Sequence, residues 1–283
     1  MSPVRIVTDS AAQFEDRRFV EDYDVVVAPL AVHFGGKTYQ DGIDIDPEEM
    51  LHRIHHTNAV PSVSGVTVEA FEAIYHELAK STDQICVLTH SAQFTDTYAS
   101  AMTARGGLLG RCEIAVIDSR TASAGLGYLV EEVALAAAAN HDLDEVIQVA
   151  RGTVPRLYSV FYVSSLEYIE RAGLIHQTQA ILGSMLDIKP LLTIEDGALI
   201  TMEKARTHSN AIDKMIEFVT EFTQIERLCI LQHTLRTTDR TRMLQDRLAL
   251  EFSRLQAPLL LYEPLTASWI GPDAMGMVIL EGE

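Results

Sequence analysis

The chain has 283 residues, 47% of them hydrophobic, with 40 acidic side chains against 22 basic ones and a net charge of −18. This apolar content supports a folded core, and the length fits one large domain or two ordinary ones. The acidic balance argues against nucleic acid as a partner. No apolar run reaches the ~18–20 residues of a transmembrane helix, so we expect a cytoplasmic protein.

The first half alternates between apolar, β-branched runs and amphipathic patterns. This alternation predicts a parallel α/β sheet with helical crossovers. Asp46 and Pro47 are typical of a helix start, because Asp caps the first backbone N–H groups and proline needs no donor there. The predicted strands are Val4–Val7, Val25–Val32, Ile85–Thr89 and Ile114–Ile117, and the predicted helices are Pro47–His56, Thr67–Ala79 and Thr121–Asn140.

The second half has a different pattern, which predicts an α+β domain. Glu195-Asp196-Gly197 separates two short strands and indicates a hairpin, since Asp-Gly favours tight turns. Gly152 and Pro155 end the preceding helical pattern, so we predict an N-terminal domain over 1–155 and a C-terminal domain over 156–283. The other predicted strands are Leu157–Val163, Leu228–Gln232, Leu259–Tyr262 and Met277–Leu280, and the helices are Arg206–Phe222 and Thr237–Phe252.

Polar triplets follow the predicted parallel strands where each strand ends. They are Thr8-Asp9-Ser10, Thr89-His90-Ser91 and Asp118-Ser119-Arg120, and the related segment Ser62-Val63-Ser64-Gly65 precedes a helix. The carboxyl ends of parallel strands share one edge of a sheet, where ligands bind. Hydroxyls and helix-start N–H groups suit a carboxylate or phosphate, although turns and helix caps explain each triplet equally well.

Other chemistries fit the sequence poorly. His90 and Ser91 are neighbours on a strand and point to opposite faces, so they cannot form a catalytic dyad, and we expect His90 to serve packing. His52, His55 and His56 share a helix face but are interpreted as surface residues, so no metal is expected. No nucleotide-binding loop is present, and no cofactor is expected. The three cysteines, Cys86, Cys112 and Cys229, lie in apolar surroundings typical of core residues in a reducing compartment.

In this order, the motifs resemble those of the DegV family over essentially the whole chain. The matching segments are Ile6–Ser10, Ala28–Phe34, Asp41-Gly42, Thr97–Ala101, Asp118-Ser119, Leu186–Leu192, Asp196-Gly197, Lys204, Arg206 and Gly271-Pro272. The resemblance implies a non-catalytic, monomeric protein that binds a long-chain fatty acid in a tunnel between two domains. Some members of the family are the lipid-binding subunit of a bacterial fatty acid kinase, which is the alternative function.

The resemblance also implies where the carboxylate binds. Ser64 and Thr95 keep hydroxyls at positions of the family's head-group motifs, and the tunnel is expected to end at Thr8, Ser64 and Thr95. The ligand-binding residues predicted from the sequence and the resemblance together are Thr8, Asp9, Ser10, Ser62, Ser64, Thr95 and Trp269. Leu174 and Trp269 replace an arginine and a histidine that the family associates with phosphotransfer, which weakens the kinase alternative more than lipid binding.

Overall fold

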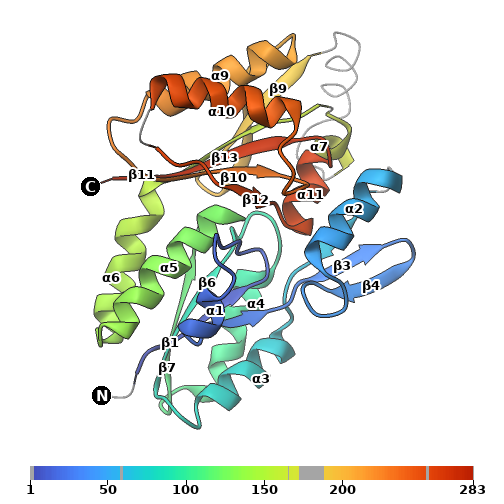
Figure 1. Ribbon diagram of the computed structural model, residues 1–283. Coiled ribbons are helices and arrows are strands. Elements are labelled where there is room, and N and C mark those ends of the chain that lie inside the picture. The colour runs from blue at the N-terminus through green and yellow to red at the C-terminus, as the bar shows by residue number, and fades with distance from the viewer. Residues whose placement is uncertain (1–2, 58–59, 165, 172–187, 253–254, 283) are drawn as a thin grey trace.

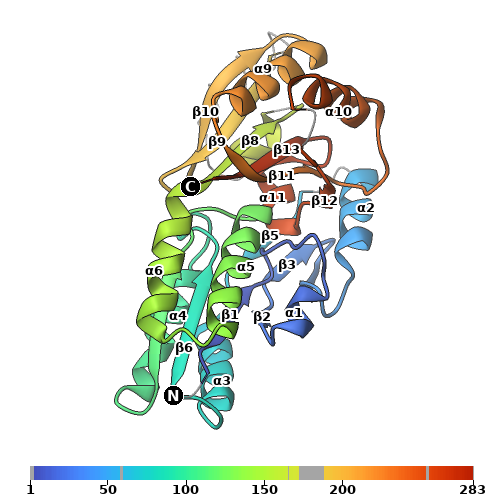
Figure 2. The ribbon, with the colours of Figure 1, turned by 60° about the vertical axis from the view of Figure 1, so that its left-hand side comes forward.

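The computed structural model describes residues 3–57, 60–164, 166–171, 188–252 and 255–282 (Figure 1). Two main sheets are stacked along the molecule, one from each half of the chain, and a small third sheet lies beside them. The chain passes from the first half to the second through α6 (Leu143–Thr153) and the short helix η2 (Val154–Arg156). Figure 2 shows this passage along one side of the molecule.

The first sheet is parallel, as predicted, with the order β2-β1-β6-β7. Its strands are β1 (Arg5–Asp9), β2 (Val26–Ala28), β6 (Gln84–Thr89) and β7 (Glu113–Asp118). The side chains of β1 and β6 are almost all buried because helices cover both faces, which explains their continuous apolar runs. On one face lie α5 (Ala124–Ala138) and α6, and on the other lie α3 (Val68–Leu78), α4 (Thr97–Ala104) and η1 (Arg105–Leu108).

The predicted single strand Val25–Val32 is wrong. Pro29 lies between β2 and β3 (Ala31–Phe34), and β3 leaves the parallel sheet. Proline has no N–H to donate to a ladder, so pairing stops there and the chain turns away. With β4 (Lys37–Gln40) and β5 (Ser62–Ser64), β3 forms an antiparallel sheet of order β4-β3-β5, placed beside α2 (Pro47–Thr57). The short helix α1 (Phe19–Asp22) precedes β2 in the chain.

The second main sheet is mixed, with the order β10-β9-β8-β13-β11-β12. The predicted hairpin is confirmed: β9 and β10 pair around Asp196 and Gly197, which both have positive φ (48° and 83°). The strands are β8 (Leu157–Tyr162), β9 (Lys189–Glu195), β10 (Ala198–Ala205), β11 (Ile225–Gln232), β12 (Leu259–Leu261) and β13 (Met275–Glu281). The helices are α7 (Glu167–Arg171), α9 (His208–Thr220), α10 (Asp239–Glu251) and α11 (Pro264–Ile270).

A parallel α/β sheet and a separate mixed sheet therefore confirm the predicted fold class, whereas the domain boundary at residue 155 stays a prediction. One apolar cluster joins the halves, since Leu129 of α5 and Cys229 of β11 belong to the same buried core. A second cluster fills the space between the mixed sheet and α9 and α10. No helix in the described part of the chain is both long and apolar enough to cross a membrane.

Candidate functional site

The carboxyl ends of β1, β6 and β7 bring three polar triplets to one edge of the parallel sheet. The Asp9 carboxylate is fully buried there, and one oxygen accepts the backbone N–H of Ala11 at 3.0 Å. The other oxygen accepts the N–H of His90, the residue after β6, at 2.9 Å. Asp9 therefore ties the loops after two neighbouring strands together, as the shared edge predicts.

The buried His90 side chain is the unexpected part of this edge. Its Nδ1 lies 2.9 Å from Asp9 Oδ2, without the direction of a proper hydrogen bond, and its Nε2 lies 2.8 Å from Thr95 Oγ1. The expectation that His90 merely serves packing is wrong, because the imidazole connects a buried carboxylate to a half-buried hydroxyl. The expectation that His90 and Ser91 lie on the strand is wrong, because β6 ends at Thr89, but Ser91 does point elsewhere and donates to the carbonyl of Gly197 at 2.7 Å.

Thr95 and Thr97 form a short hydroxyl chain at the start of α4. Their Oγ1 atoms lie 2.8 Å apart, and Thr95 Oγ1 also accepts the N–H of Thr97 at 3.2 Å. Thr97 Oγ1 accepts the N–H of Val66 at 3.1 Å. A Cβ on Gly65 would lie 2.8 Å and 2.9 Å from the Oγ1 atoms of Thr97 and Thr95, so glycine lets the chain after β5 approach both hydroxyls.

The remaining predicted hydroxyls are placed differently. Ser64 is exposed, and its Oγ lies 2.8 Å from Nε2 of His33 on β3. Thr8 is buried, and its hydroxyl has no hydrogen-bond partner among the described residues. Ser10 accepts the N–H of Leu30 and donates to Asp41, so its hydroxyl already has two partners. Burial raises the pKa of Asp41 to about 6, against the opposing effect of the Ser10 hydrogen bond.

An open cavity of about 570 Å³ lies next to the hydroxyl chain and is lined by both halves of the protein. Trp269 of α11 is buried and stacks on Phe94, with the ring centroids 4.2 Å apart. Ser62 and Val63 of β5 supply one wall, and Arg171 of α7 stands at another. Of the predicted site residues, Ser62 and Trp269 line this cavity, whereas Ser64 and Thr95 are not among its lining residues. The full lining is Val60, Pro61, Ser62, Val63, Gln93, Phe94, Arg171, Leu265, Ser268 and Trp269.

A second cavity between the halves, of about 700 Å³, lies where the β9–β10 hairpin meets the end of β7. Arg120 donates to Asp196 of the hairpin at 3.2 Å, next to the contact between Ser91 and Gly197. The hairpin therefore rests on the same sheet edge as the hydroxyl chain. Its contacts with Ser91 and Arg120 join the mixed sheet to the parallel sheet.

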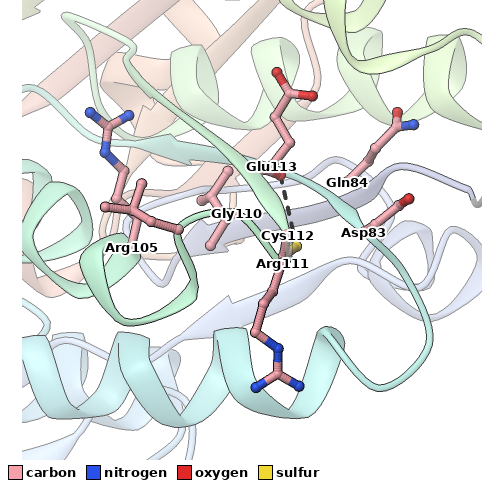
Figure 3. Close-up of a pocket in the computed structure, with 9 residues that line it drawn as sticks. Asp83, Gln84, Arg105, Gly110, Arg111, Cys112 and Glu113 are labelled. Atoms are coloured by element: carbon pink, nitrogen blue, oxygen red, sulfur yellow. Dashed lines mark hydrogen bonds between the residues drawn. The ribbon is translucent and has the colours of Figure 1, made fainter.

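Figure 3 shows a third cavity, of about 540 Å³, at the opposite edge of the parallel sheet. Gln84 and Glu113, the first residues of β6 and β7, line it. Arg105 and Arg111 extend away from each other in the figure and do not converge on one anion. Burial raises the pKa of the Cys112 thiol, which makes it a poor nucleophile. We assign no ligand to this cavity.

The histidines of α2 are arranged as a stack. The rings of His52 and His56 lie 4.0 Å apart, and His55 stacks on His233 of the second half at 4.3 Å. Among the described residues, no group of three or more His, Cys, Asp and Glu side chains could hold a metal ion. Cys86, Cys112 and Cys229 are free and buried, as predicted.

Sequence reasoning missed the roles of His90, Thr97 and Phe94. The available signal was the five-residue spacing from His90 to Thr95, which lets a loop fold back onto the end of its own strand. The spacing alone could not show that Asp9 lies behind His90, because that contact joins residues 81 positions apart. Leu174 and the segment Leu186-Asp187 lie outside the described residues.

Comparison with known proteins gives a consistent result. The chain matches the family described as "Uncharacterised protein, DegV family" over residues 3–282. A DegV domain-containing protein of Caldanaerobacter subterraneus is 32% identical over 219 residues, 77% of each chain. A DegV family protein from Thermus thermophilus, described by its fatty acid binding, is 26% identical, covers 99% of this chain and 100% of its own, and superposes with a TM-score of 0.84. A fatty acid binding DegV family protein from Streptococcus agalactiae shares the fold (TM-score 0.88, full coverage of both chains) at 20% identity.

Proposed function

Because this chain belongs to the DegV family, we propose that it binds a long-chain fatty acid or a similar amphiphile and is not catalytic by itself. The carboxylate binds at the hydroxyls of Ser64 and Thr95 and at nearby backbone N–H groups. The acyl chain runs past Phe94 and Trp269 into a tunnel between domains 1–155 and 156–283. The single observation that carries the proposal is the hydroxyl chain beside an aromatic-lined cavity contributed by both halves.

The physical chemistry of the cavity favours such a ligand. Each buried CH₂ group of an acyl chain contributes about 0.8 kcal/mol before the cost of ordering the chain. Hydroxyls and N–H groups hold a carboxylate without a metal or a lysine, through charge-assisted hydrogen bonds. The fatty acid binding described for the Thermus thermophilus relative, which matches the chain over nearly its full length, supports the same ligand class.

We propose that the protein acts as a cytoplasmic monomer and serves poorly as the lipid-presenting subunit of a fatty acid kinase. Phosphoryl transfer needs cationic groups around the transferred phosphate. The buried, stacked Trp269 offers no such group, and Arg171 is held in an ion pair by Glu167. An in vitro assay with a bacterial fatty acid kinase should show little acyl-phosphate with the wild type and more with Trp269→His. Efficient turnover by the wild type would refute this part of the proposal.

The test of lipid binding uses extraction and titration. Mass spectrometry of organic extracts from purified protein should detect a long-chain fatty acid at near one equivalent. Thr95→Val should then weaken binding of a fluorescent fatty acid by about 1.5–3 kcal/mol, because it removes a hydrogen bond to a charged group. Thr103→Val is the matched control, since that hydroxyl donates to the carbonyl of Ala99 on the exposed face of α4. Equal affinity of the two variants would refute the assignment of Thr95.

A further inference from the structure

We infer that the fatty acid carboxylate binds together with one proton, which His90 takes up, so that the Asp9–His90 pair selects for an anionic head group. The inference rests on the proposed function, because it concerns how that carboxylate is held. The His90 imidazole lies between the buried Asp9 carboxylate and the Thr95 hydroxyl, with one ring nitrogen close to each.

The hydroxyl protons give the first argument. Thr95 Oγ1 has one proton and two lone pairs, and it already accepts the N–H of Thr97. When His90 is neutral with its proton on Nδ1 toward Asp9, Nε2 is an acceptor and takes the Thr95 proton. When His90 is protonated, Nε2–H donates to Thr95 Oγ1 and releases the hydroxyl proton. The other neutral tautomer, with its proton on Nε2, would set the bare Nδ1 lone pair against Asp9 Oδ2 2.9 Å away. Protonation of His90 therefore lets Thr95 donate to a ligand carboxylate without that repulsion.

The charges give the second argument. Asp9 is fully buried on one side of His90, and the ligand carboxylate would bind on the other side. If His90 were neutral, no positive charge would separate the two carboxylates, and they would repel each other. Protonation of His90 makes the pair neutral overall and removes that repulsion. The other charged groups packed around the edge are mostly acidic. Asp41 is bonded to Ser10 next to Asp9, and Asp118 accepts the N–H groups of Ala92 and Arg120.

Two arginines lie near these groups, but their charges are taken up by other carboxylates. The charge of Arg17 stabilises the ionised form of Asp41, and the Arg120 guanidinium donates to Asp196 in the hairpin. His33 is the other histidine that contacts a site hydroxyl, through Ser64, and it is half-buried on β3. It is therefore the competing proton acceptor that an experiment must separate from His90.

The experiment is calorimetric titration of the full chain with palmitate at about pH 8, in buffers of different ionisation enthalpy. The wild type should take up close to one proton per ligand at this pH, and its Kd should rise as the pH is raised further. Hexadecanol, which has the same chain without a charge, should bind without proton uptake. His90→Gln should lose the uptake and the pH dependence, whereas the exposed control His141→Gln should behave as the wild type.

Other results would overturn the inference. Palmitate binding without proton uptake would refute it and leave the proposed function standing, whereas no palmitate binding would refute both. Uptake that persists in His90→Gln, or that disappears in His33→Gln alone, would place the proton elsewhere. Should His90→Gln fail to fold, imidazole nitrogen NMR of the wild type decides, because the His90 signals must change from neutral to protonated when palmitate is added.

Discussion

At the carboxyl edge of the parallel sheet the buried side chains include Asp9, His90 and Thr97, whereas α11 contributes Leu265 and Trp269 to the cavity. The polar groups belong to strand ends and loops tied down by buried hydrogen bonds. The apolar groups belong to a short helix that is buried along its whole length. The buried polar contacts therefore come from the first half of the chain, whereas the apolar walls come from both halves, because Val63 and Phe94 line the cavity together with Leu265 and Trp269.

The largest expected effect is that of Trp269→Ala on the apolar side. Removing a buried aromatic side chain that stacks on Phe94 should lower the free energy of unfolding by about 3–5 kcal/mol. The same variant should weaken binding of long fatty acids more than short ones, because the lost surface faces the acyl chain. Denaturant unfolding measures the first effect. A loss no greater than that of the exposed control Met243→Ala would contradict the assignment.

Glu263, which caps α11, gives a pH-dependent prediction. Burial raises the pKa of Glu263 to about 7 from 4.5, so the folded state holds this proton more tightly than the unfolded state. The free energy of unfolding of the wild type should therefore fall as pH rises from 4.5 to about 7. Above about pH 7 the carboxyl is ionised in both the folded and the unfolded state, so the loss of stability is complete. Glu263→Gln keeps Oε1 as the acceptor for Thr266 and avoids the charge.

This variant should be more stable than the wild type by up to about 3 kcal/mol at alkaline pH, with a difference that vanishes toward acidic pH. Urea unfolding over the pH range measures it, with the exposed Glu251→Gln as control. A pH-independent difference would show that the buried carboxyl does not titrate in this range.

Gly65→Ala tests the polar side. The new methyl group would lie less than 3 Å from the Thr95 and Thr97 hydroxyls, so the chain after β5 must move and the hydroxyl chain must open. Fatty acid affinity should fall by about 1.5–3 kcal/mol, the value of a hydrogen bond to a charged group. Gly152→Ala is the matched control, because nothing lies within 4 Å of its added Cβ and it sits in α6. Similar affinities of the two variants would exclude a close approach at Gly65.

The smallest effects concern the contacts between the halves. Ser91→Ala removes a buried hydrogen bond to Gly197 and should destabilise the protein by about 1 kcal/mol. Arg120→Ala removes an exposed ion pair with Asp196 in the same hairpin and should cost less than about 0.5 kcal/mol. Thermal unfolding of both variants compares them directly. A larger loss in Arg120→Ala would mean that the surface pair holds the halves together.

The sequence predicted those parts of the fold that depend on local patterns. Apolar runs bounded by polar triplets located β1, β6 and β7, and Asp196-Gly197 located the hairpin. The small sheet was missed because β3 and β5 are four and three residues long and pair with each other although they lie far apart in the sequence. Strand pairing of that kind leaves little trace in hydrophobic periodicity.

The candidate site also has a part that the sequence predicted and a part that it missed. The residue types and the ends of the parallel strands were enough to predict that hydroxyls gather at one sheet edge, since parallel strands all end on the same side. The sequence could not decide which hydroxyls are already engaged: Ser10 is bonded to Asp41 and Leu30, and Thr95 is bonded to His90 and Thr97. Only the tertiary structure placed His90 between Asp9 and Thr95 and Trp269 against Phe94, because hydrogen bonds and ring stacking depend on distances that residues far apart in the chain acquire when it folds.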